Sequence, residues 1–280
     1  MSVTWSWKLL RAGSFRLDGG SMFGVVPKAV WARLAPPDEH NRIPLQTNCL
    51  LLERDGTRVL IESGFGEKWS DKERNLYDLE RRTIVDALRE ISVTPDSIQH
   101  VIVTHLHFDH AGALTSRGPE GEPVPTFPGA EIIVQRTEWD DALANKSTMT
   151  RTYLRSHLDP IADRVRLLEG KAEVFPGAGI TVEPVPGHTW GQQSVWFRDE
   201  IGPVVFPGDV MPTVNHVGLP FSMGYDMLPH TNMLTKAALL ERAVRENVRL
   251  VLDHEPGVAV VRAAPDDAPG RSGRFVLCEA

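Results

Sequence analysis

Three histidines and one aspartate lie within residues 105–110, with the spacing H-x-H-x-D-H. The residues just before them, Val101 to Val103, are a β-branched apolar run typical of a strand that is buried on both faces. Because side chains of an extended chain alternate between two faces, His105 and His107 project to the same side. Two imidazoles on one side of a strand end can bind one metal ion.

The second half of the motif offers another group of ligands. Asp109 and His110 are adjacent and cannot share one face of a strand, so the chain has to turn there. Residues 111–114 are suitable for the start of a helix after that turn. At this histidine content such a cluster arises by chance only about a few times per million windows. We therefore interpret it as a metal site rather than as unrelated core or surface histidines.

Three further candidate ligands lie at or beyond the ends of predicted strands. His188 lies in the loop 186–191, where glycines allow a side chain to come close to a metal. Asp209 and His254 each follow an apolar run. The strands concerned are predicted at residues 180–185, 194–198, 203–206 and 249–252. Functional sites of α/β sheets form at such strand ends, so these residues should meet the first cluster.

The pattern H-x-H-x-D-H resembles the signature of the metallo-β-lactamase-fold hydrolases, and the three further candidates match that family's remaining ligands. The resemblance implies an α/β fold, an αββα sandwich of two mixed β-sheets packed face to face with helices outside, as a single domain over residues 1–280. It also implies two metal ions per chain. The implied ligands are His105, His107 and His188 for one ion, Asp109, His110 and His254 for the other, and Asp209 as a bridge.

Such a centre would be catalytic, because each ion keeps an open coordination position. Imidazole and carboxylate ligands suit zinc, the cation that we expect, and also iron, manganese or cobalt. Two adjacent cations lower the pKa of a bridging water to about 7 and polarise a carbonyl or phosphoryl oxygen, so the expected reaction is hydrolysis.

Two further segments resemble one branch of the family, the quorum-quenching N-acyl homoserine lactonases. They are residues 18–28, which read D-G-G-S-M-F-G-V-V-P-K, and residues 209–229, which contain D-V-M-P-T and G-Y-D-M-L-P. The resemblance implies opening of the lactone ring of N-acyl homoserine lactones by a metal-bridging hydroxide. It disfavours a true β-lactamase, because the antibiotic-degrading members lack a match to Asp209.

Other functions on the same scaffold are the alternatives, namely a glyoxalase II-like thioesterase or an organophosphate hydrolase. A glutathione thioesterase would usually carry a basic C-terminal region, whereas residues 257–280 contain only three arginines. A non-catalytic or redox metal protein is an alternative of another class. An oxygen-reducing member would need a flavin domain, for which 280 residues leave no room.

The resemblance also indicates residues that act on the substrate. Lactonases of this fold resemble one another in using a tyrosine as donor to the oxyanion or the departing alkoxide, and Tyr225 is the only tyrosine in residues 211–230. His216 is the rival donor, and Asp109 is a third catalytic candidate. We expect an apolar groove for an acyl tail. Its candidate residues are Met22, Phe23, Leu106, Phe108, Phe221 and Met223.

Glu62 departs from the family pattern, which usually has an aspartate before a small residue and glycine at this point. In the family that acid is usually outside the ligand set, so the longer side chain puts local hydrogen bonding in doubt rather than the ligands.

Composition limits the partners. A net charge of −7 argues against nucleic acid, which would need a basic face. The N-terminus has no signal-peptide pattern, and no run of 18 apolar residues occurs, so we expect no membrane partner. Cys49 and Cys278 cannot form a disulfide framework; we expect both to be packed and the protein to be cytoplasmic. The expected partners are a small-molecule lactone or ester and, in a homodimer, a second copy.

Local patterns predict the remaining elements. Residues 48–53 and 57–61 should form a hairpin across Asp55-Gly56, and a strand is expected at 131–135. Helices are expected at 79–91, at 231–247 and, as a pair, within 138–168, where His157 should be a surface histidine. The remaining predictions are an ordered loop at 18–31, a loop at 117–128, and a closing hairpin of 257–262 with 274–278.

Overall fold

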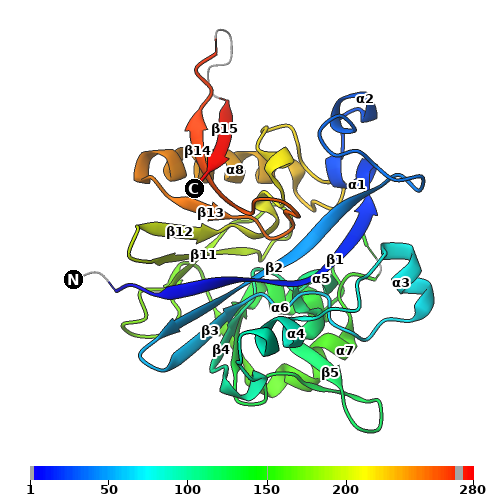
Figure 1. The fold of residues 1–280 in the computed structure, drawn as a ribbon, viewed down its shortest axis with the longest axis vertical. Helices are drawn as coiled ribbons and strands as arrows, with labels where there is room; N and C mark the ends of the chain where they lie inside the picture. The colour runs from blue at the N-terminus through cyan, green and yellow to red at the C-terminus, as the bar shows by residue number, and fades with distance from the viewer. Residues whose placement is uncertain (1–2, 150, 269–273) are drawn as a thin grey trace.

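The structure, a computed structural model, describes residues 3–149, 151–268 and 274–280. Two large β-sheets form its centre (Figure 1). Within the described residues, the strands of the first sheet are, in spatial order, β1 (Ser6–Asp18), β2 (Arg42–Arg54), β3 (Thr57–Ile61), β4 (His100–Ile102), β7 (Glu131–Gln135) and β8 (Val165–Leu168). The last four run parallel, and the first three are antiparallel neighbours.

The second sheet contains one parallel pair, β12 with β13, among antiparallel neighbours. Its strands in the described chain are, in spatial order, β15 (Phe275–Glu279), β14 (Val260–Pro265), β13 (Arg249–Val251), β12 (Pro203–Phe206), β11 (Gln193–Arg198), β10 (Thr181–Pro184) and β9 (Ala172–Glu173). A separate short ribbon pairs β5 (Thr115–Arg117) with β6 (Pro123–Pro125). Both large sheets are therefore mixed, as predicted.

Alternation of side chains along the strands separates an inner apolar layer from two outer ones. In β2, Leu50 belongs to the core between the sheets, whereas Leu51 belongs to the core on the outer face of the first sheet. In β12, Val204 faces inward and Val205 faces the outer core of the second sheet. The two sheets thus pack face to face, and each still has an apolar outer face to cover.

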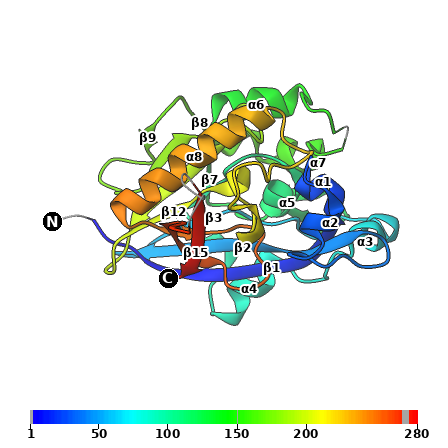
Figure 2. The same ribbon diagram turned by 90° about the horizontal axis from the view of Figure 1, so that it is seen from above.

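Helices cover these outer faces, with α4 and α8 on opposite sides of the molecule (Figure 2). The helices are α1 (Gly19–Phe23), α2 (Lys28–Trp31), α3 (Asp71–Tyr77), α4 (Ile84–Glu90), α5 (Phe108–Ala111), α6 (Arg136–Leu143), α7 (Arg155–Leu158) and α8 (Pro229–Glu246). The arrangement is the αββα sandwich that the sequence predicted.

The longest helix shows how the sequence produces this covering. Leu239, Leu240 and Ala243 recur at helical spacing along α8 and are buried against the second sheet. Burial of a leucine side chain stabilises the fold by about 1.5–3 kcal/mol. Asn247 ends the helix in the left-handed conformation, with φ 51°, which asparagine adopts more readily than most residues.

Hydrogen bonds join the two sheets at the edge where the predicted ligands lie. The amide of Asn48 in β2 donates to the carbonyl of Asp253, just past β13, at 2.8 Å. The amide of Gln193 at the start of β11 donates to the carbonyl of Thr104, just past β4, at 2.9 Å. Because each bond links one sheet to the other, the loops that follow β4 and β13 are fixed relative to one another.

Several local predictions were wrong. Residues 18–31, expected as a loop, contain α1 and α2, and the Asp18 side chain accepts a hydrogen bond from the amide of Ser21 at the start of α1. The segment 138–168, expected as a pair of helices, contains α6 and α7 but ends in β8, which pairs with β7. Pairing with a neighbouring strand overrides a local helical pattern here.

Two helix boundaries and one predicted loop also differ from the structure. The helix expected at 79–91 begins at Ile84, because Thr83 and Asp86 form a capping box there. The helix expected from residue 111 begins earlier, at Phe108. The loop expected at 117–128 contains the short strand β6.

Other expectations concerned cysteines and membranes. Cys49 is buried as predicted, but Cys278 is exposed, because it lies on the outermost strand β15. The closing hairpin is confirmed as β14 and β15. Within the described residues, no helix combines the length and the apolar character needed to cross a membrane.

His157 was predicted to lie on the surface, but the structure buries it, with 2% of the residue exposed. It belongs to α7, and its ring packs edge-on against Trp69, with centroids 6.0 Å apart. Burial and the nearby Lys68 ammonium lower the pKa of His157 from its ordinary 6.5 to about 3. The side chain is therefore neutral in the folded protein at physiological pH.

This shift predicts a pH-dependent stability. Because the folded-state pKa of about 3 lies below 6.5, protons bind preferentially to the unfolded chain, and the stabilising contribution declines as pH falls below 6.5. From pH 7.5 to pH 5 we expect His157 to account for a loss of about 2 kcal/mol in the free energy of unfolding. Urea denaturation of the wild type and His157→Leu at several pH values measures it. Parallel pH profiles for the two proteins would contradict the assignment.

Candidate metal centre

All seven predicted ligands lie together at the edge where the two sheets meet, and none is more than 8% exposed. They come from four loops. The H-x-H-x-D-H residues follow β4 and enter α5, and His188 lies between β10 and β11. Asp209 lies in a 3₁₀ turn (Gly208–Val210) after β12, and His254 follows β13. Each loop leaves a strand of one of the two large sheets, so rigid elements position all of these side chains.

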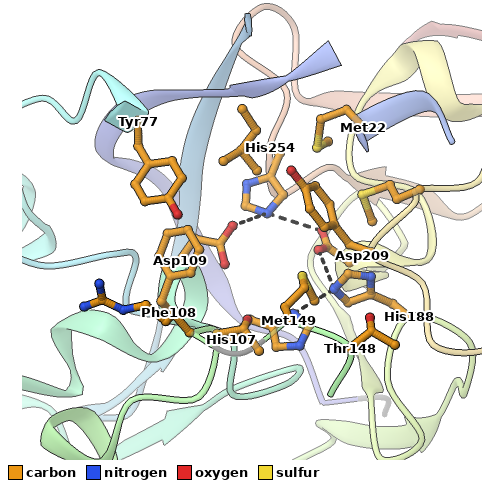
Figure 3. A pocket seen from close by; sticks show the side chains of 15 residues that line it. Met22, Tyr77, His107, Phe108, Asp109, Thr148, Met149, His188, Asp209 and His254 are labelled. Atoms are coloured by element: carbon orange, nitrogen blue, oxygen red, sulfur yellow. Dashed lines mark hydrogen bonds and ion pairs between the residues drawn. The ribbon is translucent and has the colours of Figure 1, made fainter. Parts of the chain in front are cut away.

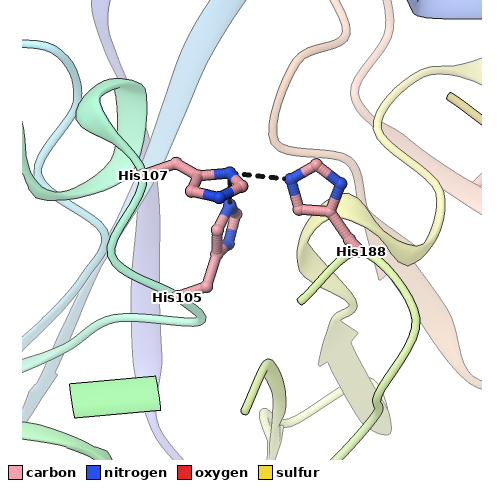
Figure 4. A group of neighbouring side chains, drawn as sticks. All are labelled: His105, His107 and His188. Atoms are coloured by element: carbon pink, nitrogen blue, oxygen red, sulfur yellow. Dashed lines mark hydrogen bonds between the residues drawn. The ribbon is translucent and has the colours of Figure 1, made fainter. Parts of the chain in front are cut away.

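Three imidazoles form the first ligand set (Figure 4). His107 Nδ1 lies 3.2 Å from His105 Nε2 and 2.9 Å from His188 Nε2. Ligand atoms placed tetrahedrally about 2.1 Å from a zinc ion are about 3.4 Å apart. The three nitrogens converge at nearly the spacing that a single ion requires.

The second ligand set lies beside the first. His110 Nε2 and His254 Nε2 are 3.1 Å apart, and Asp109 Oδ2 lies 3.6 Å from His254 Nε2. Asp109 Oδ1 lies 3.9 Å from His110 Nε2. These atoms offer two imidazole nitrogens and a carboxylate to one cation.

Asp209 lies between the two sets (Figure 3). Its Oδ2 is 3.1 Å from His188 Nε2 in the first set, and its Oδ1 is 3.3 Å from His254 Nε2 in the second. One carboxylate therefore presents an oxygen to each set, which is the geometry of a bridging ligand.

Acceptors outside the ligand sets orient the imidazoles. His254 Nδ1 lies 3.0 Å from the carbonyl oxygen of Gln46, which can only accept a hydrogen bond, so Nδ1 carries the proton. His188 Nδ1 lies 2.9 Å from Asp226 Oδ1 in the same way. Glu62 Oε2 lies 3.4 Å from His110 Nδ1.

These contacts test whether a metal ion fits. With protons on the outer nitrogens, the Nε2 atoms of His110 and His254 point lone pairs at each other across 3.1 Å, which is repulsive unless a proton or a metal cation lies between them. Although burial opposes it, the carboxylates of Asp253 and Asp209 raise the pKa of His254 to about 9, so the surroundings favour a positive charge. The donor set fits two divalent cations.

A cavity of about 410 Å³ opens onto the ligands. Its floor includes Asp109, Asp209 and His254, and most of its walls are apolar or aromatic. The residues that line it are Leu17, Met22, Tyr77, His107, Phe108, Asp109, Thr148, Met149, Arg151, Thr152, His188, Asp209, Met223, Tyr225 and His254. The site therefore joins a cation centre to an apolar chamber.

Comparison with protein families matches residues 42–254 to the metallo-beta-lactamase superfamily. This match covers more than half of the 280 residues. The chain belongs to the metallo-beta-lactamase superfamily. Among structures, a probable metal-dependent hydrolase from Staphylococcus aureus superposes with a TM-score of 0.86 at 27% identity, covering 100% of this chain and 99% of that one.

Two other superfamily members are similar to this chain. An N-acyl homoserine lactonase of Bacillus thuringiensis is 31% identical over 164 residues, which are 54% of this chain and 58% of the lactonase. The match thus spans less than two thirds of that relative. A solved N-acyl homoserine lactone hydrolase, with N-hexanoyl-L-homoserine bound at its catalytic metal centre, has a TM-score of 0.67 at 25% identity, covering 91% and 95% of the two chains.

Glu62, which departs from the superfamily pattern, lies beside the candidate ligands. Its Oε1 accepts a hydrogen bond from the amide of Thr104 at 2.8 Å, while Oε2 faces His110. Glu62 itself has φ 66°, in the left-handed region that non-glycine residues seldom adopt. Such backbone strain persists only where the surroundings fix it, and here it aims the longer carboxylate at the ring of His110, a candidate ligand.

The sequence did not reveal Glu138, a buried carboxylate of α6. It accepts hydrogen bonds from the amide of Leu106 at 2.9 Å, the Tyr153 hydroxyl at 3.1 Å and the Thr189 hydroxyl at 2.5 Å. One side chain thereby ties the loop of His105 and His107 to the loop of His188. No local pattern distinguishes it from the other acids of an amphipathic helix.

Asp226, also missed, orients His188 and is held by Asn232 Nδ2 and the amide of Met223. We expect Asp226→Asn to weaken metal binding at the first ligand set about tenfold, because an amide oxygen is a poorer acceptor for the imidazole N–H. Titration of metal-free protein with zinc measures the change. Unaltered affinity would mean that the loop alone positions His188.

His216 does not face the cavity, so the structure contradicts its role as a donor to substrate. Its Nε2 donates to the carbonyl of Met22, and its Nδ1 accepts from the Thr213 hydroxyl, each at 2.8 Å. The ring stacks on Phe23, with centroids 4.8 Å apart. With both nitrogens used and the ring fully buried, His216 packs its loop against α1.

The predicted substrate residues divide into two groups. Met22, Phe108 and Met223 line the cavity. Phe23 and Leu106 are buried in apolar cores and do not line it, and Phe221 packs edge-on against Phe23 outside it. These three expectations were wrong because Leu106 points from the motif into the core of the first sheet, while Phe23 and Phe221 pack against each other beside the cavity.

Three wall residues come from segments without a recognisable pattern, namely Tyr77 at the end of α3, Met149 and Arg151. Arg151 forms an ion pair with Glu73 of α3 at 2.7 Å. Figure 3 shows Tyr77 and Met149 at the rim around the ligands. The cavity is therefore completed by α3 and the segment after α6.

Proposed function

We propose that this chain is a dinuclear metal-dependent hydrolase that opens the lactone ring of N-acyl homoserine lactones. The observation that carries the proposal is the apolar cavity whose floor is the two-set ligand centre. The similarity to lactonases, one of them with a homoserine product at its metal centre, supports this substrate class.

The first ligand set and Asp209 would hold one cation, and the second set with Asp209 the other; zinc suits the imidazoles. Such cations, when bound, supply hydroxide at neutral pH and polarise the lactone carbonyl. In the net reaction a C–O bond forms from water to the carbonyl carbon, the ring ester C–O bond breaks, and a proton reaches the departing alkoxide.

Side chains of this chain orient the substrate and move that proton. Asp109 lines the cavity and belongs to the second ligand set, so its carboxylate can take a proton from water and return it to the alkoxide. Tyr225 lines the same cavity and offers a hydroxyl to the oxyanion or the alkoxide. Met22, Phe108 and Met223 would contact the acyl tail.

A substrate panel tests the proposal. Protein of known metal content is assayed on hexanoyl and decanoyl homoserine lactones, an aryl ester, a glutathione thioester, an organophosphate and a cephalosporin. We expect kcat/KM to be highest for a lactone and at least about 10²-fold lower for the cephalosporin, a difference of nearly 3 kcal/mol in transition-state stabilisation. A thioester or an organophosphate as the best substrate would overturn the lactone assignment.

A further inference from the structure

Asp253 is a carboxylate of the centre that the seven-ligand pattern does not include. It precedes His254 just past the end of β13 and is 1% exposed. One of its carboxylate oxygens lies within 4.8 Å of the ligand atoms of His110, Asp209 and His254. Asp253 does not line the substrate cavity, so its carboxylate approaches the second ligand set from the protein interior.

One of the two carboxylate oxygens of Asp253 has no hydrogen-bond partner among the described residues. Its Oδ1 accepts from the amide of His254 at 3.1 Å, and its Oδ2 is buried with no hydrogen-bond partner among the described residues. A buried carboxylate oxygen is costly without a donor or a cation. Because this oxygen is buried beside the second ligand set, a cation that compensates it would lie within the centre.

No lysine or arginine among the described residues forms an ion pair with Asp253. The carboxylates of Asp209 and Glu62 instead add negative charge around it, and the imidazoles of His110 and His254 are the groups that can oppose it. A divalent cation between these groups would satisfy Oδ2 and offset the accumulated charge.

We propose that Asp253 supplies a third carboxylate to the second ligand set and thereby makes this set select a harder cation than the first. The first set offers three imidazole nitrogens and one oxygen of Asp209. With Asp253, the second offers two imidazoles and three carboxylates. Oxygen-rich sets suit manganese(II), whereas imidazole-rich sets suit zinc. The inference rests on the dinuclear centre of the proposed function and is independent of its substrate.

The test is a titration of metal-free protein with Zn²⁺ and with Mn²⁺, comparing wild type, Asp253→Asn and Glu255→Gln. Glu255 is the matched control, because it is a buried neighbouring carboxylate that accepts from the amides of Val214 and Gly257. We expect Asp253→Asn to weaken the second Mn²⁺ by about 10- to 100-fold, zinc at the first set to change little, and Glu255→Gln to behave as wild type.

Thermal unfolding distinguishes a metal-ligand role of Asp253 from a purely structural role. If Asp253 is a ligand, the metal-free Asp253→Asn protein is at least as stable as metal-free wild type, because a carboxyl group is removed from beside the carboxylates of Asp209 and Glu62, while the Tm increase produced by Mn²⁺ becomes smaller. A structural residue would lower stability in both states and leave the increase unchanged, which overturns the proposal. Activity enters neither measurement, so failure of the lactone assignment leaves this test intact.

If the Asp253→Asn protein does not fold, a measurement on the wild type alone still tests the proposal. Crystals of protein loaded with equal Zn²⁺ and Mn²⁺ are measured at both absorption edges. Manganese concentrated between His110, His254 and Asp253 is the expected result. Equal occupancy of both sets by both metals, or a second ion outside contact with Asp253, would refute the assignment.

Discussion

Asp209→Ala is expected to lower kcat/KM for a homoserine lactone by at least about 10³-fold. Asp209 is the residue whose two oxygens face different ligand sets, 3.1 Å from His188 and 3.3 Å from His254. Its loss leaves each set short of one oxygen and removes the link that fixes their separation. We expect elemental analysis to show loss of at least one ion per chain.

The control for this prediction is Asp199→Asn. Asp199 is a half-buried aspartate that pairs with Arg249 and accepts from the Trp7 indole, away from the ligands. Its replacement should lower Tm but leave metal content and turnover near wild type. An Asp209→Ala protein that keeps two ions and near-wild-type turnover would show that the bridging oxygen is dispensable.

The clustering of the candidate metal ligands was predictable because their signals are local. Alternation along an extended chain places His105 and His107 on one side, and each remaining ligand follows a strand whose apolar residues identify it. Sequence-distant candidate ligands such as His110 and His254 meet because both sheets end at the same edge. The four-layer architecture followed from the family resemblance, and the alternating cores explain it physically.

The chamber walls could not be predicted in the same way. Tyr77 and Met149 come from segments without a periodic pattern, and their place at the rim depends on tertiary packing. Leu106 lies inside the motif, yet its side chain belongs to the core of the first sheet. His216 and His157 were misplaced because the sequence does not show what surrounds an isolated histidine.

Packing also determines which side chain can donate a hydrogen bond to a substrate. With His216 bonded at both nitrogens, Tyr225 is the remaining candidate from the 211–230 segment. Burial raises the pKa of Tyr225 to about 12, so the hydroxyl keeps its proton across the neutral and mildly alkaline range. It therefore remains a hydrogen-bond donor throughout that range.

Tyr225→Phe should lower kcat for lactone opening by about 10²- to 10³-fold, the usual cost of removing one donor to a developing oxyanion, while two ions stay bound. Tyr77→Phe is the matched control, because Tyr77 also lines the cavity and loses the same atom. If both variants lose turnover equally, the hydroxyls act only through the polarity of the chamber. If Tyr225→Phe retains wild-type kcat, the metals alone stabilise the oxyanion, and Tyr225 only lines the cavity. A selective loss in kcat, with KM and metal content unchanged, places the Tyr225 hydroxyl on the transition state rather than on the bound substrate.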